Sequence, residues 1–389
     1  MTAPVVKGLA LPGYAELFAQ SNFSFQHGAS HPEELVVRAR ALGYQALALT
    51  DECSVAGVVR AHTQAQQSGL QLLPGAVFRL QAMRGQPSTA VQKPSLLDCP
   101  NVSGMADGWR MVVLPRHLGG WGQLCQYITA ARGVARKGAY VATLPAPGSH
   151  ALAGCEIILL PPRVSAMGTD ADLSFLIAFS AHIESARAIF DDKNHGLWLG
   201  VVLHQAADDD WWLMQLDHCA SRAGVPLVAA GGVLMHARSR KPLHDVLTAV
   251  RLGTPVVDCG QALLPNAQAH LRTRLQLGRL YPPDLLANTL EVARRCTFSL
   301  TELRYHYPLE TVGAGETPSQ TLARLTWAGA EWRYGVGAGC DAPGFREEIS
   351  PVVPGWRAVV SGAELGSGEV ASSAELGLSE LASYAARAR

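Results

Sequence analysis

The stretch that decides the fold is "SHPEELVVRARALGYQALALT", residues 30–50, in which a capped helix precedes a buried strand. Ser30 and Glu33 have the spacing of a capping box. Pro32 suits the first helical turn, and Gly43 suits the position after the last turn. Apolar side chains recur at helical spacing, at Leu35, Val36, Ala39 and Leu42. The apolar run that follows predicts a short strand, so this stretch reads as one helix-strand unit.

The same alternation continues along the first 240 residues. A helix at 55–69 and a strand at 70–80 come next, followed by a Pro/Gly/Ser-rich segment at 82–108 that we predict to be an exposed insertion. Further strands are predicted at 109–115, 154–162, 196–204 and 225–235, and helices at 120–138, 171–190 and 208–224. Strands that alternate with helices at this spacing predict an α/β protein with parallel strands and favour a barrel over an open sheet.

The character of the sequence changes twice after the predicted barrel. Residues 241–334 are mainly helical, with segments at 240–253, 265–280 and 282–296, so we place a domain boundary at 240. Residues 335–389 are rich in Gly, Ala and Ser without a sustained period, which predicts a disordered or out-of-frame tail. The abrupt change at 335 indicates a frameshifted or truncated gene product; a natural divergent tail is the alternative.

Composition limits the classes of function. The chain has 389 residues, 48% hydrophobic and 16% charged, with a formal net charge of zero. No apolar run reaches the roughly 20 residues of a membrane span, and no signal peptide is apparent, so we expect a cytoplasmic protein. A neutral chain contacts nucleic acid only through local basic patches. The candidate DNA-binding residues are Arg238, Arg240, Lys241, Arg272 and Arg274; ordinary solvated helix faces are the alternative interpretation.

The stretch "ELFAQSNFSFQHGASHPEELVVRARALGYQALALTDECSVAGVVRAH", residues 16–62, resembles the N-terminal polymerase-and-histidinol-phosphatase (PHP) domain of bacterial C-family DNA polymerases. It is most similar to the error-prone paralogue of their alpha subunit, and ordered similar segments continue to Tyr334. The resemblance implies a distorted (β/α)7 barrel followed by the start of the polymerase palm and thumb. For the full-length family it implies Mg²⁺-dependent DNA synthesis past lesions. The partners it implies are DNA, the sliding clamp and other mutagenesis proteins.

Active PHP barrels hold divalent ions with His, Asp and Glu at the carboxyl ends of their strands. Matched to the motifs of the family, this chain departs at most of these positions, which are Phe18, Gln20, His27, Asp51, Glu52, Val77, Gly232 and Leu234. His27 and Glu52 are the weak metal candidates that remain, and we expect no metal. The other interpretation of His27 is a loop histidine that faces solvent. Asp51 fits a turn acceptor, and His236 fits a surface or interdomain residue.

Three functions remain open at this point. The leading one is a fragment of an error-prone polymerase with a degenerate PHP site, inactive alone because it lacks the acids of the palm. The second is a metal-dependent phosphoesterase or exonuclease. The third is a non-catalytic scaffold that binds DNA or a polymerase partner.

Overall fold

The computed structural model of the protein describes residues 11–81, 108–163, 171–190, 196–304 and 312–334. The predicted insertion at 82–108, except for Gly108, lies outside the described residues. The whole predicted tail at 335–389 lies outside them as well. Within the described ranges, no helix is both long enough and apolar enough to cross a membrane.

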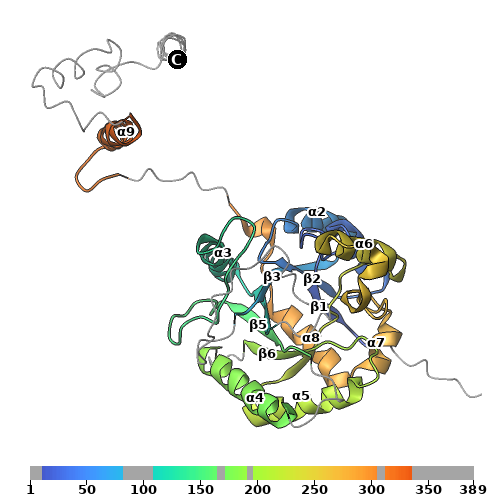
Figure 1. The fold of residues 1–389 in the computed structure, drawn as a ribbon. Helices are drawn as coiled ribbons and strands as arrows, with labels where there is room; N and C mark the ends of the chain where they lie inside the picture. Colours follow the sequence, from blue (N-terminus) through green and yellow to red (C-terminus); the bar gives the residue numbers. More distant parts are fainter. Residues whose placement is uncertain (1–10, 82–107, 164–170, 191–195, 305–311, 335–389) are drawn as a thin grey trace, which may run out of the picture. The chain divides into compact units, whose positions relative to one another are not determined.

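Seven strands form one sheet in the order of the sequence (Figure 1). They are β1 (Ala15–Ala19), β2 (Ala46–Glu52), β3 (Gln71–Arg79), β4 (Arg110–Pro115), β5 (Cys155–Leu160), β6 (Leu197–Val201) and β7 (Leu227–Ala229). The sheet closes where β1 meets the chain after β7. The amide of Gln20 donates to the carbonyl of Val233 at 2.9 Å, and the amide of Val233 donates to the carbonyl of Phe18 at 2.9 Å. The predicted α/β barrel is confirmed.

One strand runs against the predicted parallel arrangement. β4 is antiparallel to both β3 and β5, whereas the other neighbouring strands are parallel. Helix α3 (Leu118–Gly133) follows β4, and a further segment at 134–154 then leads to β5. That segment pairs Ala142 with Leu80 beyond the end of β3, then returns the chain so that Cys155 starts opposite Pro115. A single helix between two neighbouring strands would make them parallel. Here α3 is followed by the segment at 134–154, which carries the chain back, so β5 runs antiparallel to β4.

The helices surround the sheet, except that the last helix of this unit lies within the ring of strands in the view of Figure 1. They are α1 (Pro32–Ala41), α2 (Val58–Ser68), α3, α4 (Ala171–Phe190), α5 (Asp209–Ala223), α6 (Lys241–Leu252), α7 (Arg274–Leu280) and α8 (Pro283–Arg295). The capping box of α1 lies one residue later than predicted. His31 is the N-cap, and its amide donates to the carboxylate of Glu34 at 2.9 Å. Ser30 is not available for the box because its hydroxyl accepts the amide of His236 at 2.8 Å.

The predicted helix at 265–280 is mostly wrong. Only α7 is helical, and it begins with its own capping box between Thr273 and Gln276. The preceding chain instead runs beside the segment after β7, where His270 forms a bridge with Met235. An interaction with a distant segment therefore replaced the local helical preference.

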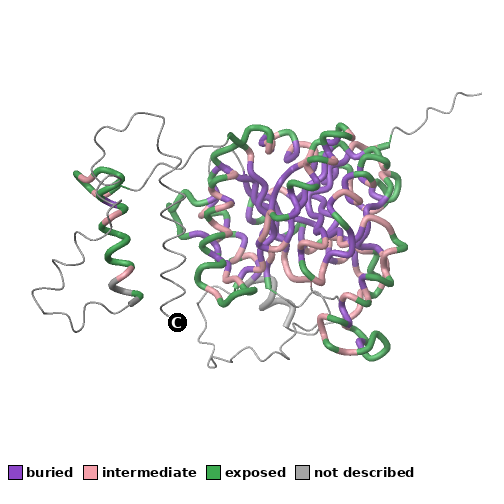
Figure 2. The backbone as a smooth tube through the Cα atoms, turned by 90° about the horizontal axis from the view of Figure 1, so that it is seen from above, coloured by how far each residue is buried: buried purple, intermediate pink, exposed green. Residues whose placement is uncertain are grey.

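The barrel interior is filled by apolar side chains from the strands and from α8. Figure 2 shows the backbone of buried residues gathered at the centre of the unit that contains the barrel. Leu17, Leu114 and Trp198 come from the strands, and Val292 and Cys296 come from α8 and the residue after it. Residues up to Arg304 consequently form one compact unit, rather than separating at the boundary that we predicted at 240. The helical segment after 240 supplies part of the barrel core.

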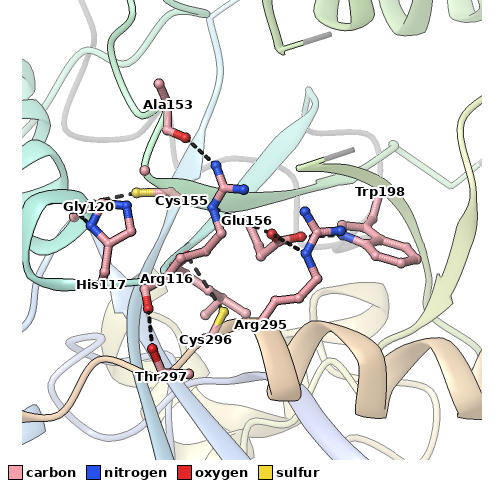
Figure 3. Close-up of polar contacts among 12 residues, drawn as sticks. Arg116, His117, Gly120, Ala153, Cys155, Glu156, Trp198, Arg295, Cys296 and Thr297 are labelled. Carbon is pink, nitrogen blue, oxygen red and sulfur yellow. Dashed lines mark hydrogen bonds and ion pairs between the residues drawn. The ribbon is translucent and has the colours of Figure 1, made fainter. Parts of the chain in front are cut away.

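A buried ionic cluster fixes α8 against the base of the barrel (Figure 3). Glu156 is fully buried at the start of β5, and its carboxylate lies 3.0 Å from Nε of Arg295 and 3.7 Å from Nε of Arg116. The indole N–H of Trp198 donates to the same carboxylate at 2.7 Å. Burial raises the pKa of Glu156, and Trp198, Arg295 and Arg116 act in the opposite direction. The cluster joins α8, β5, β6 and the end of β4.

Residues 305–389 form a second unit, in which the described helix is α9 (Pro318–Tyr334). Its apolar side chains Leu322, Leu325 and Trp327 are exposed. Arg324 pairs with Glu316 at 2.8 Å, across the start of this helix.

The ionic cluster generates a stability prediction. Arg295→Gln leaves the buried Glu156 carboxylate without its nearest cation, so the free energy of unfolding should fall by about 3 kcal/mol. Urea unfolding followed by tryptophan fluorescence measures the change. Arg294→Gln is the matched control, because Arg294 lies next to Arg295 on α8 with a side chain that is 73% exposed. Equal unfolding midpoints for the two variants would show that the cluster does not stabilise the fold.

Candidate functional site

The carboxyl ends of the strands bring the family's metal positions to one rim of the barrel. Two of these positions hold apolar side chains that point into the core, Phe18 at 4% exposure and Val77 at 2%. Gly232 carries no side chain, and Leu234 packs with a small apolar cluster that includes Ala29 and Met235. None of these side chains offers a donor atom to an ion.

Asp51 holds the serine-rich loop after β1. Its Oδ1 accepts the amide of Ser21 at 2.7 Å and the hydroxyl of Ser24 at 2.8 Å, and its Oδ2 accepts the hydroxyl of Ser21 at 2.8 Å. Burial raises the pKa of Asp51, and the serine donors act to lower it. The loop turns tightly here, since a Cβ on Gly28 would lie 2.0 Å from the carbonyl oxygen of Ser21. The prediction that Asp51 is a turn acceptor is confirmed.

Gln20 has the same structural role. It is 5% exposed, and its side-chain amide donates to the hydroxyl of Ser24 at 3.1 Å. The hydroxyl of Ser24 also accepts the amide of Glu52 at 2.9 Å. The loop is therefore joined to the ends of both β1 and β2.

Glu52 is held by a guanidinium and a phenol. Its Oε1 lies 2.9 Å from Nε of Arg79 and accepts the hydroxyl of Tyr140 at 2.9 Å. Nη2 of Arg79 donates to the other carboxylate oxygen at 3.2 Å. Burial acts to raise the pKa of Glu52, but Arg79, His27 and Tyr140 hold it below its ordinary value. The carboxylate is ionised and already balanced by protein charge.

His27 does not face solvent as the loop interpretation predicted. Its Nδ1 lies 2.9 Å from the carbonyl of Phe25, so this nitrogen carries the proton. Its Nε2 then accepts from Nη2 of Arg79 at 2.9 Å and from Nη1 of Arg251 on α6 at 2.8 Å. Burial lowers the pKa of His27, against the opposing effect of Glu52 and the Phe25 carbonyl. The lone pair that could bind a metal is directed at two guanidinium groups.

The residues present do not fit a divalent metal centre. Among the described residues, no group of three or more His, Cys, Asp and Glu side chains is arranged to hold an ion. Catalytic ions need several protein ligands with free lone pairs. Here Arg79 and Arg251, which the sequence analysis missed, donate to the side chains that remain. The signal in the sequence was Arg79, a charged residue at the end of a mainly apolar strand.

Two further histidines lie beside the rim. His236, predicted at the surface or between domains, is half-buried, and its Nδ1 lies 2.8 Å from the Ser30 hydroxyl. His204 was missed by the sequence analysis, although it ends the strand predicted at 196–204. It lies beside Gly232, and its Nε2 donates to the carbonyl of Gly231 at 2.9 Å. Burial, together with Arg272, lowers the pKa of His204 to about 4.

The structure separates the predicted DNA-binding residues. Arg272 is wrong as a surface contact: it is 2% exposed, and its Nη1 donates to the carbonyl of Leu203 at 2.7 Å. The sequence could not show that Arg272 is buried, because its neighbours include Glu16, which is distant along the chain, as well as Tyr281.

The other candidates differ in exposure and pairing. Arg240 pairs with Glu34, and Lys241 pairs with Asp245 at 2.6 Å. Arg274 is half-buried and donates to the carbonyl of Pro12 at 3.5 Å, whereas Arg238 is exposed. DNA binding by these four residues stays a prediction.

The Asp51 contacts generate a prediction for the loop. Asp51→Asn replaces one acceptor oxygen with an NH₂ group and removes the charge, so the free energy of unfolding should fall by about 2 kcal/mol. Urea unfolding measures this change, and limited proteolysis reports on the loop at residues 20–29. Asp217→Asn, an exposed acid on α5, is the control and should match the wild type. If Asp51→Asn resisted urea and protease as well as the control does, the assigned role of Asp51 would be contradicted.

His204 generates a prediction of pH dependence. An unfolded histidine takes up a proton near pH 6.5, while folded His204 stays neutral down to about pH 4. Between these values the unfolded state binds more protons, so stability is full above pH 6.5 and falls as the pH approaches 4. His204→Gln should reduce that slope by up to about 1.4 kcal/mol per pH unit. The exposed His218→Gln should leave it unchanged, and an unaltered slope in His204→Gln would refute the assignment.

Comparisons with known proteins agree with this architecture. The PHP domain family matches residues 16–144. The error-prone DNA polymerase of Bordetella parapertussis is 45% identical over 332 residues, which cover 83% of this chain and 28% of that protein. The corresponding protein of Ralstonia nicotianae is 41% identical over 348 residues, 86% of this chain and 29% of that protein. That of Azoarcus sp. strain BH72 is 44% identical over 338 residues, 84% of this chain and 30% of that protein.

A solved amidohydrolase structure from Chromobacterium violaceum aligns with 57% of this chain and 88% of its own, at 14% identity and a TM-score of 0.39, too distant to bear on the site. The chain spans only about 28% to 30% of the length of the polymerases named above. The resemblance found in the sequence is confirmed: residues 16–144 match the PHP domain family, and the chain is similar to error-prone bacterial DNA polymerases over the part of their length that it spans.

Proposed function

We propose that this chain is the PHP-barrel part of an error-prone DNA polymerase and that its barrel is a scaffold without hydrolytic chemistry. The observation that carries the proposal is that the polar side chains at the rim already have hydrogen-bond and ion-pair partners within the protein. Asp51 is satisfied by serine donors, Glu52 by Arg79 and Tyr140, and His27 by two guanidinium groups. Metal-dependent hydrolysis would have to break these contacts before an ion could be bound.

The charge balance of the rim supports the same conclusion. A metal site of this kind uses cations to neutralise clustered carboxylates, and the ions then activate water. In this chain the guanidinium of Arg79 neutralises Glu52, with a distance of 2.9 Å between Nε and Oε1. A guanidinium is always protonated and cannot generate a hydroxide nucleophile. A guanidinium in place of a metal ion still neutralises the carboxylate at the rim, but it provides no activated water.

DNA synthesis belongs, in this proposal, to the whole polymerase. Nucleotidyl transfer needs acids that hold Mg²⁺ ions between the primer terminus and the triphosphate. We assign these acids to parts of the relatives beyond the length matched by this chain. The proposal extends to damage-induced synthesis past lesions in the cytoplasm, with DNA, the sliding clamp and other mutagenesis proteins as partners. This chain alone should extend no primer.

Metal binding and hydrolysis test the proposal directly. Protein treated with chelator and reloaded with Mn²⁺ or Zn²⁺ should retain far less than one ion per chain after desalting, as measured by mass spectrometry. The same protein should release no nucleotide from end-labelled DNA, because its remaining ligands already accept protein hydrogen bonds.

The double variant His27→Gln/Glu52→Gln is the matched control and should behave as the wild type does in both measurements. A stoichiometric ion in the wild type that the double variant loses would establish a metallo-phosphoesterase or exonuclease instead. Primer extension by the purified chain would overturn the assignment of synthesis to the rest of the polymerase.

A further inference from the structure

Helix α6 has an outer face that is apolar and exposed. Leu243, Val246 and Val250 recur every three or four residues, so they share one side of the helix, and all three are exposed. The short 3₁₀ helix η2 (Val256–Asp258) packs next to α6 and adds Val256 and Val257, of which Val257 is 88% exposed. We call these five residues the α6 face. In Figure 1, α6 lies outside the ring of strands.

The opposite side of the same helix is fixed to the barrel. His244, Thr248 and Ala249 are buried, and Arg251 donates to Nε2 of His27 at 2.8 Å. The fold therefore uses the inner side of α6 and does not require an apolar outer side. Valine also has a lower helix propensity than alanine or the long polar residues, because its χ1 angle is restricted in a helix. Exposed valines on α6 weaken the helix locally, and they become favourable only when another surface covers them.

An exposed charge lies at each end of the α6 face, and the two charges have opposite signs. Arg238 begins the 3₁₀ helix η1 (Arg238–Arg240) just before α6, and Asp258 ends η2. Both are exposed, and neither has an ion-pair partner in the parts of the chain that the structure describes. On α6 itself, Lys241 pairs with Asp245 at 2.6 Å. The surface thus has an apolar centre with a positive end and a negative end.

We propose that the α6 face is the contact surface between two copies of this chain, whose α6 helices pack antiparallel. In a two-fold arrangement the same surface serves both copies. The start of one helix then lies beside the end of the other, so Arg238 of each copy faces Asp258 of the other copy. The helix dipoles also oppose each other in this arrangement. A parallel arrangement would instead bring like charges together.

Charge and polarity together select a second copy as the occupant. The surface is complementary to itself after a two-fold rotation, with apolar side chains against apolar side chains and each charge against its opposite. An apolar centre with charges at its rim is the usual composition of a protein–protein interface. One helix from each copy gives a small contact, so association should be reversible and should depend on concentration. This association does not depend on the proposed function above.

Sedimentation velocity tests the proposal with the full chain, from about 1 µM to about 200 µM, and should show a reversible monomer–dimer equilibrium. Val250→Glu places an unpaired carboxylate in the centre of the contact, so the dissociation constant should rise at least about tenfold. The matched control is Val59→Glu on α2, because Val59 is 63% exposed and Val250 is 60% exposed. The control should associate as the wild type does.

A charge exchange tests the antiparallel arrangement. Arg238→Asp brings two carboxylates together at both ends of the contact, and Asp258→Arg brings two guanidinium groups together. Each variant alone should therefore raise the dissociation constant at least about tenfold. An equimolar mixture of the two variants restores opposite charges at both ends, so it should associate about as tightly as the wild type.

Three outcomes would overturn the proposal. A wild type that stays monomeric at the highest concentration would leave the α6 face to another polypeptide, such as the rest of a polymerase. A dimer that Val250→Glu does not weaken would form elsewhere, for example through the exposed apolar side chains of α9. A mixture of the charge variants that associates no better than either alone would exclude the antiparallel contact. All the substituted side chains are exposed, and circular dichroism confirms that each variant is folded.

Discussion

The closure of the barrel between β1 and the chain after β7 is the constraint on which the rest of the structure depends. β7 itself has only three residues, so closure relies on the following residues exchanging hydrogen bonds with the end of β1. The fully buried carboxylate of Glu16 fastens this seam by accepting the amide of Gly231 at 2.8 Å and the hydroxyl of Tyr14 at 2.9 Å. A Cβ on Gly231 would lie 2.0 Å from that carboxylate, which explains the glycine. Phe18, Gln20 and Gly232 lie along the same seam, so its geometry sets the rim.

Around the rim, protein cations contact the polar side chains that remain. Arg79 contacts both Glu52 and His27, and Arg251 reaches the same histidine from α6. Buried charges are tolerated when they are paired and hydrogen-bonded, and apolar replacement of other members of such a cluster can leave stability unchanged. Phe18 and Val77 lie at positions where the resemblance implies metal ligands, and both join the interior core. The rim keeps its geometry, and its charges are balanced by side chains of the protein itself, Arg79 and Arg251.

The two ends of the barrel use the same physical solution. At the base, Arg295 and Arg116 balance the buried Glu156, and Val292 of α8 and Cys296 after it pack in the interior. At the rim, Arg79 balances Glu52. Arginines that look like surface cations in the sequence are therefore divided by the fold. Arg272 and Arg295 stabilise the interior, while Arg238 stays at the surface.

The amino-acid sequence by itself determined the alternation of strands and helices, the barrel class and the apolar side chains at positions where the resemblance implies metal ligands. These features follow from local periodicity and from the identity of single residues. Phe18 and Val77, for example, have no side-chain atom that could bind a metal in any fold. Only the tertiary structure decided the reversed direction of β4, the packing of α8 into the barrel, and the partners of His27. Arg251 lies 224 residues from His27 along the chain, and Glu16 lies 215 residues from Gly231. Contacts at such separations leave no local pattern, because they exist only once the seam has closed and brought the segments together.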